Sequence, residues 1–220
     1  MDINFWHERW KQGQIGFHQQ HTNPYLERYW PILTQGKKST VFVPLAGKSK
    51  DLLWLLQQGH PVIAVEVNAP AVQAFFTENK LQPSVSTLGE FNVYECNGLK
   101  FYQGDFFRMT PAMLEDTGLV FDRASLVAMP ASMRHDYVRH LASLQSAHCL
   151  SLLVTMDYNQ AEMEGPPFSV PEIMVQELCG PLYNIEKLQQ CDVLADNARF
   201  RERGLTSLQD LIFKLEKKGA

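Results

Sequence analysis

The chain has 220 residues, 45% of them hydrophobic and 20% charged, which are ordinary values for a globular protein, so we expect a single domain over residues 1–220. The net charge of −4 gives no reason to expect a nucleic acid or an anionic membrane as a partner, and no apolar run approaches the roughly 20 residues of a membrane span. The first ten residues lack the pattern of a signal peptide and the four cysteines show no CxxC pairing, which together favour a cytoplasmic protein with free thiols.

Residues 1–36 are unusually rich in aromatic side chains. Phe5, Trp6 and Trp10 lie at helical spacing, so one short helix could present them on one face. A second helix is predicted to begin near Pro24. Two interpretations remain open: the rings cover one side of a sheet, or they form a lid that encloses a flat or cationic ligand.

The rest of the chain is organised around residues 40–68, which predict a strand, a tight loop, a helix and a second strand. The first strand covers residues 41–43, Gly47 lies in the loop, and the second strand covers residues 62–67 with Glu66 near its end. In Rossmann-like sheets an acid about 20 residues beyond the glycine accepts hydrogen bonds from ribose hydroxyls. Only one glycine is present where a dinucleotide fold has three, so a unit without any ligand would give much the same pattern.

Helices and strands alternate through the remainder of the chain. The predicted elements are a helix capped by Asn68, a loop over 81–90, a hairpin at Asn97-Gly98, a buried strand over 119–129, a helix through Met133, Tyr137 and Leu141, a strand over 149–156, a helix from Pro171 that ends before Gly180, and two final strands around the charged loop 195–204. This alternation predicts an α/β fold, a three-layer αβα sandwich with a mainly parallel sheet, to which the final strand pair could add one antiparallel strand.

Charged side chains fall at or near the predicted carboxyl ends of strands, where ligands bind in such sheets. They are Glu66, Asp105, Asp122 and Arg123. Placing Asp122 and Arg123 within an apolar strand is costly unless the charges are paired or used. The two residues are therefore either an ion pair that braces a helix to the sheet, or a clamp for an anion or carboxylate in which Arg123 binds through its planar fork.

Three other kinds of site are not supported. Gly47-Lys48-Ser49 could end a phosphate-binding loop, but that motif needs a glycine five positions earlier, where the chain has Phe42. His18 and His21 lie in a loop-like stretch without a nearby cysteine or paired carboxylate, so no metal site is expected. No GxSxG segment indicates a serine hydrolase.

Five segments carry a recognisable pattern. They are WHERWKQGQIGFHQ at 6–19, VFVPLAGKSKDLLWLLQQGHPVIAVEV at 41–67, GDFF at 104–107, FDRASLVAMPASMRHDYV at 121–138 and LLVTMDYNQAEMEGPPFSV at 152–170. Through them the chain resembles, over nearly its whole length, the thiopurine S-methyltransferases of the bacterial type, within the class I S-adenosylmethionine-dependent methyltransferases. One departure is Ala46, which stands where many relatives carry Cys and keeps a small residue there.

The resemblance implies a Rossmann-like fold with a seven-stranded sheet and one antiparallel strand, S-adenosyl-L-methionine as the methyl donor, and no metal. The residues implied to bind this cofactor are Trp10, Leu45, Glu66, Asp105, Phe106 and Arg123. Glu66 would accept the ribose hydroxyls, Leu45 would lie beneath the methionine part, and Asp105 and Phe106 would flank the adenine. Trp6 and Phe17 would close the lid and bind substrate, and Arg123 is the residue implied to be catalytic.

The implied reaction needs no nucleophile from the protein, because a sulfonium methyl group is already activated and a thiol or thiolate attacks it in line. Positioning and desolvation would be the main contribution of the protein. Asp122 and His18 are candidates for a base. Three functions stay open: methyl transfer to thiopurines and similar aromatic or heterocyclic thiols, methyl transfer to another small nucleophile such as a halide or an inorganic selenium or tellurium species, and nucleoside binding without catalysis. We expect a monomer.

Overall fold

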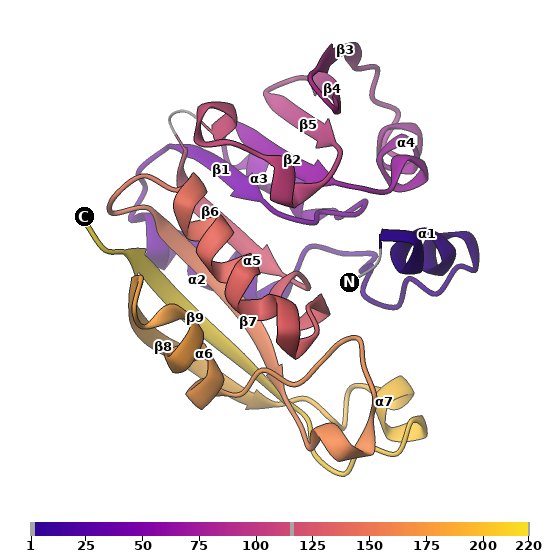
Figure 1. Ribbon diagram of the computed structural model, residues 1–220, viewed down its shortest axis with the longest axis vertical. Coiled ribbons are helices and arrows are strands. Elements are labelled where there is room, and N and C mark those ends of the chain that lie inside the picture. The colour runs from indigo at the N-terminus through magenta and orange to yellow at the C-terminus, as the bar shows by residue number, and fades with distance from the viewer. Residues whose placement is uncertain (1–2, 115–116, 220) are drawn as a thin grey trace. The chain divides into compact units, whose positions relative to one another are not determined.

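The computed structural model describes residues 3–114 and 117–219, which form two compact units that divide between Phe121 and Asp122 (Figure 1). The helices of the first unit are α1 (Ile3–Lys11), α2 (Pro24–Thr34), α3 (Asp51–Gln57) and α4 (Ala69–Glu78), with the short 3-10 helices η1 (Phe106–Arg108) and η2 (Pro111–Leu114). Its strands are β1 (Thr40–Val43), β2 (Val62–Glu66), β3 (Ser84–Leu88), β4 (Phe91–Cys96), β5 (Leu99–Gln103) and β6 (Thr117–Arg123), the last of which runs into the second unit.

The second unit contains three helices and three strands among its described residues. The helices are α5 (Ala131–Leu144), α6 (Glu172–Cys179) and α7 (Ala198–Glu202), with the short helices η3 (Leu126–Ala128) and η4 (Gln160–Glu162). The strands are β7 (Leu150–Asp157), β8 (Tyr183–Asp192) and β9 (Gln209–Lys217). β9 lies between the other two and is antiparallel to both, so the predicted final pair of strands is confirmed.

Within the first unit the strand order is β3-β4-β5-β2-β1-β6. β5, β2, β1 and β6 are parallel to one another, whereas β3 and β4 form an antiparallel hairpin that pairs with β5. The carboxyl ends of β1, β2 and β5 therefore lie along one edge. Since each residue of β2 is buried, as are three of the four in β1, these strands read as short apolar runs in the sequence.

The predicted count of seven strands with one antiparallel is wrong, because the described residues contain nine strands and both hairpin strands are antiparallel to their neighbours. The hairpin at Asn97-Gly98 is confirmed, with positive φ angles of 49° and 83°. The loop predicted over 81–90 instead holds β3. Every side chain of β3 is exposed, so its sequence SVSTL lacks the alternation of apolar and polar residues that indicates a strand.

A buried histidine joins α2 to the amino ends of β1 and β2. The indole Nε1 of Trp30 donates to Nε2 of His60 over 3.1 Å, and Nδ1 of His60 lies 2.9 Å from the carbonyl oxygen of Ser39. Burial lowers the pKa of His60 below its ordinary value, the carbonyl of Ser39 opposes that shift, and Lys38 adds to it. His60 is therefore neutral in the fold, with its proton on Nδ1.

Asp51, the first residue of α3, ties the loop after β1 to Asn23, the residue before α2. The sequence predicts Ser49 or Asp51 as the cap of α3, which is wrong, because the N-cap residue is Lys50 and no side chain caps the helix. The Ser49 hydroxyl accepts a hydrogen bond from the backbone N–H of Asp51 over 3.2 Å. The Asp51 carboxylate accepts instead from the backbone N–H of Asn23 over 2.7 Å and from the Ser49 hydroxyl over 2.8 Å. Asn23 itself caps α2. This bond fixes the start of α2 beside the loop that carries Gly47.

Across the residues that the structure describes, each helix is too short or too polar to cross a lipid bilayer. The longest of them, α5, has 14 residues and contains two arginines and an aspartate. The length needed for a membrane span is about 20 apolar residues.

Replacing Gly104 by alanine should destabilise the fold, because a Cβ there would lie 2.4 Å from Cδ1 and 2.7 Å from Cε1 of the buried Phe91 ring. We expect G104A to lose roughly 1–3 kcal/mol of unfolding free energy in urea titrations, the usual cost of overpacking a core. Removing the ring in the double variant F91L/G104A should recover part of this loss. Wild-type stability of G104A would contradict the packing described.

Candidate active site

The carboxyl end of β2 carries a buried acid. Glu66 is 6% exposed, and its two carboxylate oxygens accept hydrogen bonds from the backbone N–H groups of Gly47 over 2.9 Å and Asn68 over 2.8 Å. Burial raises the pKa of Glu66 above its ordinary value, and the backbone N–H groups of Asn68, Gly47 and Val67 oppose that rise. Each oxygen keeps a further lone pair, so the carboxylate can hold the loop and still accept from a ligand hydroxyl.

The loop between β1 and α3 is not a phosphate cradle. Its Gly47 N–H points at a carboxylate, and the fixed negative charge of Glu66 would repel a phosphate there. The Lys48 ammonium forms an ion pair with Glu78 of α4 over 2.6 Å, and Lys50 donates to Asn79 over 3.0 Å. Both lysines are therefore directed to the end of α4.

Aromatic rings from residues 5–17 pack over this loop. A Cβ placed on Gly47 would lie 3.2 Å from Cζ2 of Trp10 and 3.8 Å from Cε2 of Phe17, so both rings contact the glycine backbone. The Phe17 ring meets Trp10 and Trp6 edge to face, with centroids 5.6 and 5.9 Å apart. The three rings are half-buried. They lie at the loop beside Glu66, a position that favours the lid interpretation over a simple cover for the sheet.

The end of β5 supplies the next two predicted residues. Asp105 is half-buried and caps η1, since its carboxylate accepts from the backbone N–H of Phe107 over 2.9 Å. Phe106 is buried, and its ring stacks on Phe42 with an interplanar angle of 12°. The Phe106 ring is thus part of the core, which leaves its backbone for the predicted contact with adenine.

In the second unit, Asp122 is 3% exposed and braces β6 to α5. Its carboxylate accepts from the Tyr137 hydroxyl over 2.8 Å and from the backbone N–H of Leu126 over 3.4 Å. Burial raises the pKa of Asp122 to about 6, against hydrogen bonds from Tyr137, Leu126 and Ser125. The bracing role that the sequence left open is therefore carried by Asp122 through Tyr137.

The strand predicted over 119–129 is wrong at its carboxyl end. β6 ends at Arg123, Ala124 adopts a positive φ of 64°, and the chain enters the short helix η3. The turn follows from Asp122, because its carboxylate bonds the backbone four residues ahead. Arg123 is half-buried and is the last residue of the strand. The structure thus brings Trp6, Trp10, Phe17, Leu45 and Glu66 together in the first unit and places Arg123 at the carboxyl end of β6 in the second.

Sequence analysis missed Arg134, which is 4% exposed in the second unit. Its Nε donates to the carbonyl oxygen of Met129 over 3.0 Å, its guanidinium lies 5.7 Å from the Phe168 ring, and burial lowers its pKa. The signal was present, because Arg134 completes an i, i+3, i+4, i+7 stripe with Tyr137, Val138 and Leu141. Arg134 holds the GPPFSV segment, whose Phe168 N–H also donates to the carbonyl oxygen of Val127 over 2.7 Å.

A small separate core supports that segment and explains a helix that was not predicted. Within the charged loop 195–204 the structure has α7, whose Phe200 is buried. The members of this core are Tyr158, Met163, Phe200, Leu205 and Leu208. The Glu162 carboxylate adds two hydrogen bonds of 2.8 Å to Thr206, one to its N–H and one to its hydroxyl. The helix was not predicted because most residues of the loop are charged or polar, and only a few apolar residues bind it to this core.

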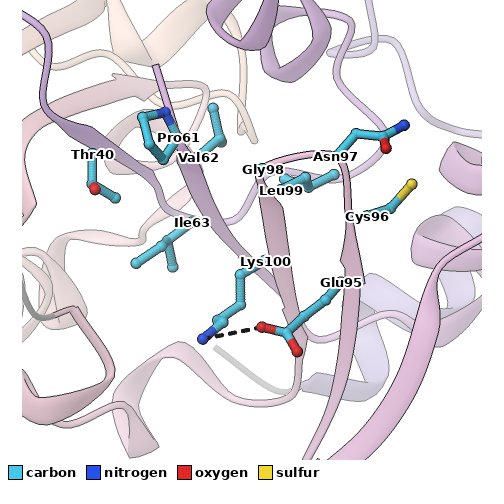
Figure 2. Close-up of a pocket in the computed structure, with 10 residues that line it drawn as sticks. All are labelled: Thr40, Pro61, Val62, Ile63, Glu95, Cys96, Asn97, Gly98, Leu99 and Lys100. Carbon is cyan, nitrogen blue, oxygen red and sulfur yellow. Dashed lines mark ion pairs between the residues drawn. The ribbon is translucent and has the colours of Figure 1, made fainter. Parts of the chain in front are cut away.

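A hollow of about 460 Å³ lies at the opposite edge of the first unit (Figure 2). It is lined by Thr40, Pro61, Val62, Ile63, Glu95, Cys96, Asn97, Gly98, Leu99 and Lys100. Thr40, Val62 and Leu99 are the first residues of β1, β2 and β5, so the hollow is at the amino ends of these strands. Figure 2 shows the Lys100 ammonium turned toward the Glu95 carboxylate, 3.1 Å away. None of the predicted site residues lines it.

Residues 3–114 and 117–219 contain no group of three or more histidines, cysteines, aspartates or glutamates placed to hold a metal ion. The four cysteines are free thiols. Burial raises the pKa of both Cys149 and Cys179 to about 12, so neither is a reactive thiolate.

The arrangement can be compared with known proteins. A family model described as thiopurine S-methyltransferase matches residues 1–218. The chain is 46% identical to a thiopurine S-methyltransferase of Pseudomonas fluorescens, over 98% of this chain and 99% of the relative. It is 44% identical to one of Shewanella baltica, over 99% of this chain and all of the relative.

The chain belongs to the thiopurine S-methyltransferase family. The family predicted from the sequence, and with it S-adenosyl-L-methionine as the methyl donor, is confirmed. Solved structures support the fold. A 1,6-didemethyltoxoflavin-N1-methyltransferase of Burkholderia thailandensis superposes with a TM-score of 0.63 at 14% identity, over 98% of this chain and 87% of the other. An arsenic(III) S-adenosylmethionine methyltransferase of Chlamydomonas reinhardtii gives 0.60 at 13% identity, over 83% and 64%. These similarities show an α/β methyltransferase fold.

Asp122 should make the stability of the protein depend on pH. Its pKa is about 6 in the fold against 3.8 when free, so the folded state holds a proton that the unfolded state has released between these values. Stability should therefore fall as pH rises through this window, by about 2–3 kcal/mol in total. The variant D122N cannot titrate, so its unfolding free energy relative to wild type should rise by that amount between pH 4 and pH 7 in urea titrations.

The exposed Asp136 of α5 provides the matched control, because its side chain is 65% exposed. D136N should differ from wild type by a constant within about 0.5 kcal/mol across the same range. A constant difference between D122N and wild type would show that Asp122 is ionised in the fold throughout.

Proposed function

We propose that the protein transfers the methyl group of S-adenosyl-L-methionine to the sulfur of thiopurines and similar small aromatic or heterocyclic thiols, giving S-adenosyl-L-homocysteine and a thioether. One observation carries the proposal: in a chain of this family, the Trp10 and Phe17 rings pack on Gly47, whose N–H is bound by the buried carboxylate of Glu66. The names of the relatives from Pseudomonas fluorescens and Shewanella baltica support the substrate class.

The residues of the first unit fit this cofactor. A buried acid at the end of β2 suits ribose hydroxyls, and half-buried aromatic faces suit a sulfonium cation. Gly47 leaves the backbone open to close approach, and a loop without a phosphate cradle suits a cofactor without phosphate. When bound, S-adenosylmethionine supplies a methyl group that is already activated for transfer.

The chain itself would bind, orient and exclude water. Glu66 would accept from the ribose, the backbone around Leu45 would lie under the methionine part, and Asp105 would flank the adenine. Trp6 and Phe17 hold a flat acceptor and keep water away from it, which aligns the sulfur and removes its hydration. Arg123 stays the catalytic residue implied by the resemblance: a guanidinium beside the acceptor would favour the thiolate form by lowering the pKa of the thiol. Asp122 remains engaged with Tyr137 and is not needed as a base.

A cytoplasmic location and a monomeric state stay predictions from the sequence. The free thiols of all four cysteines support a reducing compartment.

Transfer of a labelled methyl group from the cofactor to a panel of acceptors tests the function. We expect label in thiopurines and aromatic thiols, and little in aliphatic thiols, selenite or tellurite. Transfer to selenite or tellurite alone would overturn the thiol assignment in favour of a small inorganic nucleophile. Binding of the cofactor without transfer to any acceptor would leave only a nucleoside-binding module.

Replacing Glu66 by glutamine should weaken cofactor binding. Both carboxylate oxygens accept backbone N–H groups, so an amide must set its own N–H against Gly47 or Asn68. We expect E66Q to lose roughly 1–3 kcal/mol of binding free energy in calorimetry, the cost of hydrogen bonds to a charged group. E90Q is the control, because Glu90 is 69% exposed in the turn between β3 and β4. If E66Q and E90Q bind the cofactor with equal affinity, Glu66 is not a cofactor-binding residue.

A further inference from the structure

The helix α1 makes a second contact with the end of β2, separate from the contact of its aromatic rings with Gly47. Nδ1 of His7 lies 2.9 Å from the side-chain nitrogen Nδ2 of Asn68. The Asn68 side-chain oxygen accepts from the backbone N–H of Ala71 over 3.0 Å, which caps α4. The Asn68 backbone N–H donates to Glu66. Asn68 is buried, and these bonds hold its side chain at both polar atoms and its backbone at the N–H.

The hydrogen-bond roles at this contact follow from the cap. Because Oδ1 of Asn68 is bound to a backbone N–H, the group that faces His7 is the amide NH₂, which can only donate. Nδ1 of His7 must therefore accept, so the imidazole is neutral with its proton on Nε2. A protonated imidazole would set N–H against N–H and break the contact.

The two contacts of α1 share one acid. Glu66 holds Gly47 with one oxygen and Asn68 with the other. Trp10, three residues after His7, packs on Gly47, and His7 bonds Asn68. The helix α1 thus contacts both segments that the Glu66 carboxylate joins, the loop after β1 and the turn after β2. We call this closed set of contacts the circuit.

We propose that His7 is a positioning residue: its neutral imidazole latches the aromatic lid, residues 3–17, onto Asn68, and its protonation releases the lid and weakens cofactor binding at Glu66. The proposal rests on the proposed function for its ligand. It makes cofactor affinity fall as pH falls, through a group that itself touches neither cofactor nor acceptor.

Other charged groups lie on α1 and on the segments that contact it. On those segments they are Glu66, two residues before Asn68, and Lys48, next to Gly47; Lys48 is paired with Glu78. On α1 itself they are Glu8, Arg9 and Lys11, of which Glu8 and Lys11 pair over 3.8 Å. Burial raises the pKa of Glu66, so this acid is the second group of the circuit that could titrate. The variants must separate it from His7.

Two substitutions of His7 do so, because both keep Glu66. His7→Asn places a carbonyl oxygen close to the position of Nδ1, so it can accept from Asn68 at every pH. His7→Leu removes the acceptor at every pH. His21→Asn is the matched control, since His21 is an exposed histidine of the same N-terminal segment. Thermal unfolding of each variant at pH 8 checks that the fold is kept.

The first measurement needs no cofactor. Amide hydrogen exchange of residues 3–17 is compared between variants at the same pH, which cancels the intrinsic pH dependence of exchange. At pH 8 wild type and H7N should exchange alike and H7L faster, and at pH 5.5 wild type should exchange faster than H7N, which stays protected. Equal exchange of wild type and H7N at both values would overturn the latch.

The second measurement is the affinity for S-adenosylhomocysteine by calorimetry. Between pH 8 and 5.5 wild type and H21N should weaken more than H7N, by up to roughly 3- to 10-fold, the range for complete loss of one hydrogen bond between neutral groups. H7L should be weak throughout. The same pH dependence in wild type and H7N would assign it to Glu66 and overturn the proposal. Absence of binding by wild type at any pH would overturn the proposed function instead, while the exchange measurement still decides the latch.

Discussion

A single buried carboxylate holds the candidate site together. Glu66 sits at the end of a strand that is buried on both faces, where an ionised group loses its hydration, and two backbone N–H groups replace that hydration at 2.8 and 2.9 Å. The bonds join the loop after β1 to the turn after β2. Because protein dipoles already surround the charge, the site needs little rearrangement to receive a ligand, which is the advantage of preorganisation.

Much of this arrangement could be predicted from the sequence. β1 and β2 are short apolar runs bounded by proline and glycine, and parallel buried strands leave that trace because nothing polar is tolerated on either face. Once the two strands were placed, the position of Glu66 at the carboxyl end followed from the topology. Asn68 as a helix cap and the Asn97-Gly98 turn were predictable for a different reason, because each depends only on local backbone chemistry.

What could not be predicted depends on contacts between distant residues or on exposed backbone. β3 pairs through its main chain while its side chains face water, so its residues carry no pattern. α7 forms because Phe200 reaches a small core that includes Tyr158, 42 positions earlier by residue number. Asp122 accepts a hydrogen bond from Tyr137 on the next helix, 15 positions later, a contact that the residues of β6 do not reveal. His7 contacts Asn68, which is 61 positions later in the chain, and no pattern of residues around either one indicates this contact.

The contact between Trp10 and Gly47 joins a large side chain to bare backbone. The Trp10 ring packs on the peptide backbone at Gly47, where a Cβ would otherwise point. A Cβ at position 47 would lie 3.2 Å from Cζ2 of Trp10, on a backbone with a positive φ of 55°, so a side chain there would both strain the loop and displace the ring. The position of the indole therefore depends on the absence of a side chain at Gly47.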